Sequence, residues 1–385
     1  ATEGQQLVSH PEVDTVVLTG GTETALRMLD AQPRMRLFAE TGGKNATIVT
    51  ALADRDHASK TVLQSAFSHS GQTCSATSLL SLEKEVYQDS KFTDALCDAV
   101  RSLEVGSAWI PKTKLGPMIR PPSGELETAL KELEPGESWA VMPRRDRQNP
   151  HLYTPAVKWG ASPGSFTHCT EFFGPVLAVM SADNLDHAIQ IVNATGYGLT
   201  SGIESLDSRE QEIWKAGVRA GNLYVNRGTT GAIVLRQPFG GMGKSAFGPG
   251  IKAGGPNYVA QLMRFEDQRP PSERVEITDA HLAELQATLQ ETQTQALPMS
   301  LDERDRLVAA IPSYAAAAAA EFSLVHDDFR LVGQDNQRRY LPVQHLRIRI
   351  DEADTPFEII ARVAAARAAG CRMTVTSSPQ LKSAT

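Results

Sequence analysis

Short apolar segments alternate with helical segments along the first part of the chain, and this alternation constrains its fold more than any other feature. Each apolar segment is bounded by turn-forming residues, whereas the helical segments place apolar residues three and four positions apart. The predicted strands are residues 13–20, 36–39, 46–49, 78–82, 176–180 and 223–225, and the predicted helices include residues 53–68 and 90–103. Strands that alternate with helices form parallel sheets, because each helix returns the chain to the edge where the next strand begins. The sequence therefore predicts an α/β protein.

Beyond about residue 270 the chain has a second α/β pattern of its own. Two helices rich in Ala, Gln and Glu are predicted, followed by a strand, a helix and another strand; these elements are residues 279–293, 301–322, 346–350, 355–370 and 372–376. Thr355 suits the N-cap of the third helix, Pro356 its first position, and Glu358 the position three residues after the cap. This pattern predicts a separate, Rossmann-like accessory α/β module.

Composition and charge exclude several classes of function. The formal net charge of −7 offers no basic surface for nonspecific binding of nucleic acid. No apolar run approaches the length that spans a bilayer. The four cysteines Cys74, Cys97, Cys169 and Cys371 lie far apart and lack the spacing of metal ligands, so we expect no metal site and a reducing compartment.

Two turns carry residues that could act as a nucleophile and a base. Cys74 lies in the stretch HSGQTCS, where backbone N–H groups are expected to lower the pKa of the thiol and to bind an oxyanion. Glu40 ends a predicted strand and is followed by Gly42 and Gly43, a position suited to a general base. The structural alternatives are a buried core thiol and a solvated loop carboxylate.

These two turns resemble the active centre of the aldehyde dehydrogenase superfamily. Four further blocks match the family in its order: residues 171–176, 193–199, 221–227 and 238–245. The resemblance covers about residues 13–258 and implies that Cys74 attacks the aldehyde and that Glu40 activates water to release the acid. The asparagines of the second and third blocks are expected to bond to the backbone as part of the scaffold.

The resemblance also implies an NAD site. The turn of Thr19, Gly20 and Gly21 is similar to the family's pyrophosphate-binding turn, although Gly21 stands where the family has a Ser. Glu171, in the block that also contains Phe173, would bind the hydroxyls of the nicotinamide ribose. A plain turn and a surface carboxylate are the structural alternatives.

The region around Thr229 is similar to the glutamate-semialdehyde (Δ1-pyrroline-5-carboxylate) dehydrogenases, and most closely to the bifunctional proline utilisation A proteins. In that family a Gly-Ala or Gly-Ser pair offers backbone N–H groups to the substrate's α-carboxylate, which here implies Gly231 and Ala232. Ser75 would supply a hydroxyl, and Phe239 would pack on the aliphatic stem. An ordinary glycine turn at the pocket entrance is the alternative.

The same resemblance divides the chain into three parts. Residues 1–72 would be the C-terminal part of an NAD-binding domain, residues 73–270 a catalytic domain with an oligomerisation segment, and residues 271–385 the accessory module. The chain starts without Met and stops just after a predicted strand, and we expect it to belong to a longer bifunctional polypeptide. FAD is expected only in an upstream proline dehydrogenase domain that this sequence does not contain.

The resemblance implies a homo-oligomer in the bacterial cytoplasm, with membrane association through the upstream domain left open. For the accessory module we prefer a role as a structural lid or in assembly over a second ligand site. Two rival functions remain: a glutamyl-phosphate reductase of the same fold, and a catalytically incomplete assembly fragment. Glu40 and the block at residues 171–176 argue against the reductase, which needs no hydrolytic base.

Overall fold

The computed structural model describes residues 2–233, 236–248, 252–266, 276–291 and 299–378. The contacts divide the chain into two units, Ala1–Leu262 and Met263–Thr385. The predicted boundary after residue 270 lies outside the described residues, and the three functional domains stay a prediction.

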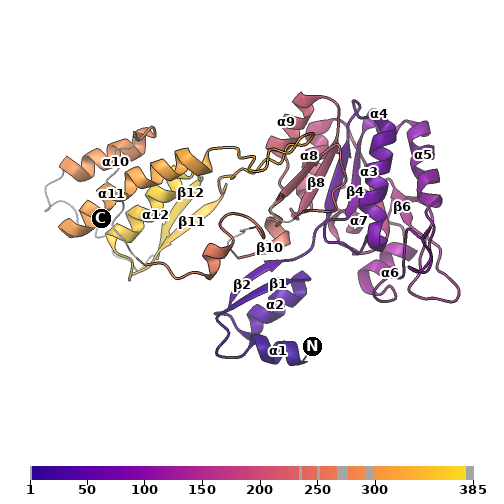
Figure 1. Cartoon of the computed structure of the whole chain (residues 1–385), viewed down its shortest axis with the longest axis horizontal. Helices are drawn as coiled ribbons and strands as arrows, with labels where there is room; N and C mark the ends of the chain where they lie inside the picture. Colours follow the sequence, from indigo (N-terminus) through magenta and orange to yellow (C-terminus); the bar gives the residue numbers. More distant parts are fainter. Residues whose placement is uncertain (1, 234–235, 249–251, 267–275, 292–298, 379–385) are drawn as a thin grey trace. The chain divides into compact units, whose positions relative to one another are not determined.

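A seven-stranded sheet forms the centre of the first unit (Figure 1). Its strands run in the order β5-β6-β7-β4-β3-β8-β9, and all neighbours are parallel except β5 and β6. The strands are β3 (Asn45–Val49), β4 (Thr77–Glu83), β5 (Ser138–Val141), β6 (Ala156–Trp159), β7 (Val176–Ala182), β8 (Thr200–Glu204) and β9 (Asn222–Val225).

Helices cover both faces of this sheet. On one face α3 (Arg55–Phe67) and α5 (Ser90–Arg101) pack on side chains such as Leu80 and Leu82; on the other, α8 (Leu185–Ala194) and α9 (Ser208–Gly217) pack on side chains such as Leu79. Adjacent residues of β4 thus serve two different cores, because side chains alternate along a strand. Each fully buried Leu or Ile contributes about 1.5–3 kcal/mol. This double burial explains why the strands of the sheet read as continuous apolar runs.

A smaller sheet precedes the large one in the sequence. Strands β1 (Thr15–Thr19) and β2 (Arg36–Glu40) pair in parallel, and β10 (Ala246–Phe247) adds to β2 in the antiparallel sense. The last residue of β1, Thr19, is in register with the last residue of β2, Glu40. The remaining elements of this unit are α1 (Thr2–Val8), α2 (Thr22–Ala31), η1 (Ser68–Gly71), α4 (Lys84–Tyr87), α6 (Gly124–Lys131), α7 (Phe166–Cys169), η2 (Gly243–Ser245) and η3 (Val259–Leu262).

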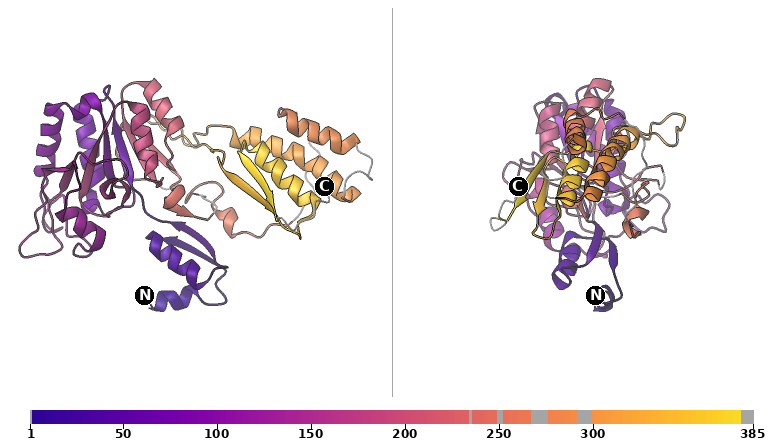
Figure 2. Two further views of the ribbon diagram at one scale, coloured as in Figure 1. Left: turned by 180° about the vertical axis from the view of Figure 1, so that it is seen from behind. Right: turned by 90° about the vertical axis from the view of Figure 1, so that its left-hand side faces the viewer.

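The second unit is a helical layer beside a two-stranded sheet, seen from behind in Figure 2. Its elements are α10 (Ala280–Glu291), α11 (Leu301–Ala317), the π-helical turn η4 (Ala318–Phe322), β11 (Leu346–Ile350), α12 (Pro356–Ala368) and β12 (Met373–Ser377). The strands pair in parallel, as a βαβ unit requires. Thr355 and Glu358 form the predicted capping box, with each side chain bonded to the other's backbone N–H.

The predicted fold class is confirmed, since both units are α/β. The sequence analysis missed β5, β6, β8 and β10. The β8 segment, TSGIE, has a glycine and three polar residues, so it lacks the apolar signal of its neighbours although it is buried throughout. In the described part of the chain, no helix is long and apolar enough to cross a membrane.

Candidate active site

The segment of residues 40–45 joins the two sheets of the first unit and organises the candidate site. It begins at the last residue of β2, Glu40, and ends at the first residue of β3, Asn45. It therefore joins the carboxyl end of β2, in the smaller sheet, to the amino end of β3, in the larger sheet. Several of these residues contact parts of the chain that lie far away in the sequence.

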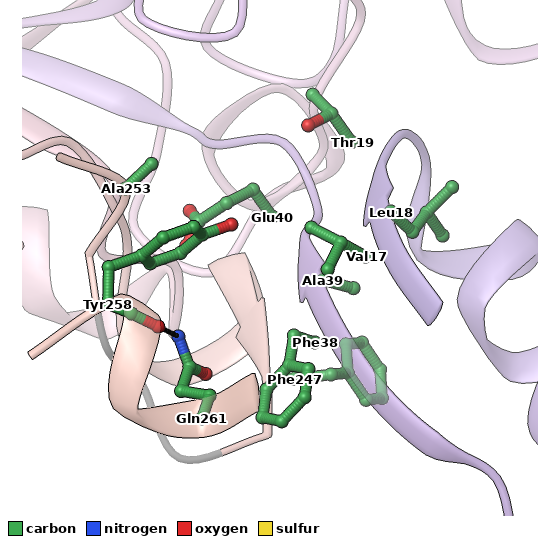
Figure 3. Close-up of a pocket in the computed structure, with 10 residues that line it drawn as sticks. All are labelled: Val17, Leu18, Thr19, Phe38, Ala39, Glu40, Phe247, Ala253, Tyr258 and Gln261. Carbon is green, nitrogen blue, oxygen red and sulfur yellow. Dashed lines mark hydrogen bonds between the residues drawn. The ribbon is translucent and has the colours of Figure 1, made fainter. Parts of the chain in front are cut away.

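Glu40 is held by a glycine-rich segment more than two hundred residues downstream. Its Oε2 accepts a hydrogen bond of 2.8 Å from the N–H of Gly241, and a Cβ at Gly240 would lie 2.9 Å from its Oε1. Burial raises the pKa of the Glu40 carboxyl, although the Gly241 N–H and the positive charge of Lys252 oppose the shift. The carboxyl lines a small pocket together with Thr19 and other residues of the smaller sheet (Figure 3). A carboxyl with a raised pKa in such a pocket is suited to take up a proton.

Glu171 reaches the same segment from the other side. Its Oε1 accepts a hydrogen bond of 2.8 Å from the N–H of Gly43. A Cβ at Gly42, where φ is +74°, would lie 2.2 Å from Oε2, so only glycine leaves room for this carboxyl. Burial raises the pKa of Glu171 to about 7, while the Gly43 N–H and the charge of Lys44 pull it down.

Lys44 is a buried cation beside these acids. Its Nζ lies 4.3 Å from the centre of the Phe172 ring, next in sequence to Glu171. Among the described residues Nζ has no hydrogen-bond partner. Burial lowers the pKa of Lys44 to about 7, and the Glu171 carboxylate raises it in opposition. Lys44 thus provides a positive charge close to Glu171 without an ion pair.

The nucleophile turn, residues 69–76, has an unusual backbone. His69, Ser70 and Gly71 all have positive φ values, of +54°, +57° and +69°. A Cβ at Gly71 would lie 2.2 Å from the carbonyl oxygen of Gly174. Such conformations are costly for residues other than glycine and persist only where surrounding contacts impose them.

Hydrogen bonds from Asn45 fix the other end of this turn. The Asn45 Nδ2 donates to the carbonyl oxygens of Cys74 and Ala76, at 2.6 and 3.0 Å, and its Oδ1 accepts from the N–H of Thr200 at 3.0 Å. Asn45 is buried. Cys74 is therefore bound to the segment that also carries Glu40, and through it to Glu171.

The pKa of the Cys74 thiol is raised, contrary to the sequence prediction. Burial is the largest cause, and the negative charges of Glu171 and Glu40 act in the same direction. The backbone N–H groups of Cys74 and Ser75 do lower the pKa, as expected, but they do not outweigh burial. The expectation failed because the burial of the thiol and the approach of the two acids both arise only in the folded chain.

The turn of Thr19, Gly20 and Gly21 lies next to Glu40. The N–H of Gly20 donates to the Glu40 carbonyl oxygen at 3.1 Å. Gly21 is the N-cap of α2 and offers no side-chain cap. This leaves the start of the helix without a hydroxyl at the position where the family has a Ser.

The residues predicted to bind the aldehyde differ in how far they are buried. Ser75 is buried in the nucleophile turn, and Phe239 is half-buried, with its backbone paired to Ala253. Gly231, at φ +85°, and Ala232 are exposed, and a Cβ at Gly231 would meet nothing within 4 Å. Phe173, predicted near the cofactor, is 41% exposed. The structure therefore groups Ser75 with the nucleophile and leaves Gly231 and Ala232 open.

The sequence analysis missed Asn45 and Thr229 as members of the site. Their signal was weak, because a single Asn or Thr before a strand or turn is common. The expectation for the other asparagines is confirmed. Asn193, Asn222 and Asn226 each donate to one backbone carbonyl and accept from one backbone N–H.

The profile of the aldehyde dehydrogenase family matches residues 1–267, which is most of the chain. The chain belongs to the aldehyde dehydrogenase family. The match includes every residue that the sequence analysis assigned to the site.

Relatives of this aldehyde dehydrogenase chain include proteins named 1-pyrroline-5-carboxylate dehydrogenase. Those of Geobacillus thermodenitrificans and Bacillus subtilis are each 33% identical over 272 residues, which is 68% of this chain and 52% of theirs. The chain thus spans about half the length of these relatives.

Solved structures extend the likeness to the second unit. Proline utilization A from Corynebacterium freiburgense is 40% identical with a TM-score of 0.86, over 98% of this chain and 37% of that one. A 1-pyrroline-5-carboxylate dehydrogenase from Thermus, determined with bound NAD, is 32% identical with a TM-score of 0.61, over 67% of this chain and 51% of that one. The first of these two similarities includes the accessory module, and the second is confined to a shorter part.

Proposed function

We propose that the protein containing this chain oxidises L-glutamate γ-semialdehyde to L-glutamate with NAD⁺. The observation that carries the proposal is the segment of residues 40–45, which gathers Glu40, Glu171 and the Cys74 turn. The aldehyde, NAD⁺ and water give the carboxylate, NADH and two protons. The names of the relatives support the choice of substrate.

In the first half of the reaction, the Cys74 sulfur forms a bond to the aldehyde carbon, giving a thiohemiacetal. The raised pKa of the thiol means that it must lose its proton to a base before or during attack. The N–H groups of Cys74 and Ser75 point toward the sulfur and are available for the developing oxyanion. Oxidation of the thiohemiacetal leaves a thioester on Cys74.

In the second half, Glu40 removes a proton from a water molecule that attacks the thioester carbon. The C–S bond breaks, the acid leaves, and the thiol regains a proton. Burial of Glu40 supports this role, because a raised pKa brings a carboxylate closer to the strength needed to deprotonate water. A reductase acting on an acyl phosphate has no hydrolytic step that would use this carboxylate.

The residues present fit NAD. Gly42 leaves space for the Glu171 carboxyl that a Cβ would fill, and that carboxyl can accept hydrogen bonds from two ribose hydroxyls. The turn of Thr19, Gly20 and Gly21 lies at the N-terminus of α2, where backbone N–H groups favour phosphate. Phe173 lies beside Glu171 and would contact the nicotinamide end. When bound, NAD⁺ supplies the acceptor for the hydride that leaves the thiohemiacetal.

For the substrate, we propose that the N–H groups of Gly231 and Ala232 bind the α-carboxylate. The positive φ of Gly231 supports this, since turns of this kind direct successive N–H groups toward an anion. Ser75 would donate its hydroxyl near the reacting carbon, and Phe239 would pack on the methylene groups. Phe239 is two residues from Gly241, whose N–H binds Glu40. The same segment would therefore contact the substrate's methylene groups and hold the base.

The organisation of the whole protein is proposed on the same basis. Residues 1–72 would complete an NAD-binding domain, residues 73–270 form the catalytic domain, and residues 271–385 form an accessory module with a role as a lid or in assembly. The similarity to proline utilization A supports a longer bifunctional polypeptide that carries FAD in another domain. A homo-oligomer in the bacterial cytoplasm is the assembly and location that we propose.

The experiment that tests the function is NADH formation from L-glutamate γ-semialdehyde by the full-length protein. Cys74→Ala should reduce the rate by about 10⁴-fold or more, because a methyl group cannot form the thioester. Glu40→Gln should reduce the steady-state rate by about 10²–10⁴-fold but retain a burst of NADH, because only thioester hydrolysis is lost.

Cys371→Ser, in the second unit, is the matched thiol control and should keep the wild-type rate. A wild-type protein that forms no NADH with this aldehyde, or a Cys74→Ala variant as active as the wild type, would contradict the proposal. A wild-type protein that forms no NADH would favour the rival function, in which this chain serves assembly and is catalytically incomplete.

A further inference from the structure

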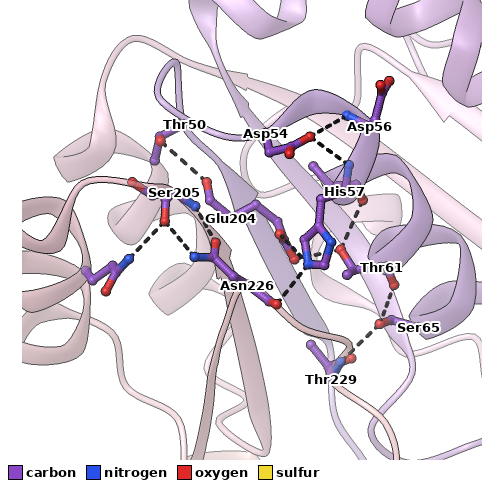
Figure 4. A network of polar contacts seen from close by, with 12 residues as sticks. Thr50, Asp54, Asp56, His57, Thr61, Ser65, Glu204, Ser205, Asn226 and Thr229 are labelled. Atoms are coloured by element: carbon purple, nitrogen blue, oxygen red, sulfur yellow. Dashed lines mark hydrogen bonds and ion pairs between the residues drawn. The ribbon is translucent and has the colours of Figure 1, made fainter. Parts of the chain in front are cut away.

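Thr229 connects the exposed anchor loop, residues 229–232, to the buried nucleophile turn. Its Oγ1 donates to the carbonyl oxygen of Ser75 at 2.8 Å, and its N–H donates to the Oγ of Ser65 at 3.0 Å. The two bonds join Thr229 to the nucleophile turn and to the end of α3, and Figure 4 shows the contact with Ser65. Thr229 is only 1% exposed, whereas Gly231 and Ala232, two and three residues on, are exposed.

The Thr229 hydroxyl that bonds to Ser75 also belongs to a row of three threonine hydroxyls, called the ladder below: Thr47, Thr77 and Thr229. The Oγ1 atoms of Thr47 and Thr77 are 3.0 Å apart, and those of Thr77 and Thr229 are also 3.0 Å apart. A carbonyl can only accept, so the single proton of the Thr229 hydroxyl is committed to Ser75. Thr77 must then donate to Thr229, and Thr47 to Thr77. The three buried hydroxyls therefore have one consistent order of donors.

The ladder is also closely packed. Gly202 lies in β8, and a Cβ there would come within 3.1 Å of the Thr47 Oγ1 and 3.2 Å of the Thr229 Cγ2. There is little room for Thr229 to move toward the sheet. The ladder thus fixes where the anchor loop leaves the buried part of the unit.

Losing the Thr229 hydroxyl would affect the two sides of the bond differently. The nucleophile turn keeps the two bonds from Asn45 and the contact of 3.4 Å from the Thr200 Oγ1 to the Ser75 carbonyl. The anchor loop keeps only the bond from the Thr229 N–H to Ser65 among the contacts described above. The loop, rather than the nucleophile, depends on this hydroxyl.

We propose that Thr229 is a positioning residue that sets the distance between Cys74 and the Gly231–Ala232 amides, and so selects the chain length of the carboxylated aldehyde. This inference rests on the proposed function. Reacting carbon and α-carboxylate are joined by a fixed number of methylene groups, so two anchors held at a fixed distance favour one length. Discrimination by one methylene group in enzymes is about 10–200-fold.

The test compares kcat/KM of the full-length enzyme for three aldehydes. They are L-glutamate γ-semialdehyde, its homologue one methylene shorter, and pentanal, which has no carboxylate. Thr229→Val keeps the shape but removes the hydroxyl, and should lower the preference for the five-carbon over the four-carbon semialdehyde by about tenfold. The rate with pentanal should change by less than about twofold, because pentanal makes no use of the anchor.

Two variants keep the test decisive. Thr229→Ser retains the hydroxyl and should restore the preference. Thr77→Val removes the donor to Thr229 and should lower the preference by a smaller factor, which covers the case in which Thr229→Val does not fold. Thr50→Val is the control and should keep the preference. Thr50 is a buried threonine that follows the last residue of β3, and its hydroxyl bonds to a backbone carbonyl outside the ladder.

Equal losses with all three aldehydes in Thr229→Val, or an unchanged preference in both valine variants, would overturn the inference and leave the proposed function standing. A wild-type enzyme that oxidises pentanal but neither semialdehyde would overturn both.

Discussion

The nucleophile turn and the anchor loop belong to the same candidate site but are built in opposite ways. The nucleophile turn buries Ser70, Gly71, Ser75 and Ala76, has three consecutive positive φ values, and is bound through Asn45 to the segment carrying Glu40. The anchor loop exposes Gly231 and Ala232 and meets the buried structure at Thr229. A reacting atom must be held in place before the substrate arrives, whereas a binding loop must admit it.

The largest expected contrast comes from one substitution in each region. Gly71→Ala should lower the free energy of unfolding by about 4 kcal/mol, because it adds left-handed strain to a clash with the Gly174 carbonyl. Gly231→Ala has the same strain but open space, and should cost about 1 kcal/mol. Urea denaturation of both variants measures the difference. Equal losses would show that the two regions are equally constrained.

The next effect concerns the link between Cys74 and the segment of residues 40–45. Asn45→Leu leaves two carbonyls and the Thr200 N–H without this partner, and should cost about 3 kcal/mol of stability. The aldehyde oxidation rate should fall by about 10²-fold, since the nucleophile would be displaced.

Asn193→Leu is the matched control for that variant. Asn193 also bonds only to the backbone, donating one hydrogen bond where Asn45 donates two and accepting one, but away from Cys74. It should lose about 1 kcal/mol of stability and keep its activity. If both variants lost activity alike, Asn45 would have no special role at the nucleophile.

The smallest effect is a pH dependence that the buried side of the site should show. Glu171 titrates near pH 7 in the folded chain instead of near 4.5, so between these values the folded state binds more protons than the unfolded state. Stability should therefore fall as pH rises through this window, by about 2 kcal/mol for this group. The nearby Lys44 has a pKa of about 7 in the folded chain, below its ordinary value of 10.5. Its contribution to stability therefore changes only above this window, where it rises with pH.

Denaturation at about pH 5 and about pH 7, both inside this window, measures this dependence. Glu171→Gln should flatten it relative to the wild type, whereas Glu132→Gln, at an exposed acid, should leave it unchanged. A wild-type protein whose stability rose through the window, or a Glu171→Gln variant with the same slope, would show that Glu171 is not protonated in the folded state.

Local rules in the sequence predicted much of the fold. The apolar period of two or of three to four residues located β3, β4, α3 and α5, and the capping residues Thr355 and Glu358 located the start of α12. These signals are readable because they act between residues a few positions apart. The motifs around Cys74, Glu40 and Glu171 likewise stood out by their glycine and aromatic neighbours.

Tertiary structure alone decided how those motifs act on one another. The bond from Asn45 to Cys74 spans 29 residues, that from Thr229 to Ser75 spans 154, and that from Gly241 to Glu40 spans 201. The raised pKa of Cys74 depends on burial and on two carboxylates distant in sequence. The physical reason is that charge interactions and desolvation follow distance in space, whereas sequence patterns report only neighbours along the chain.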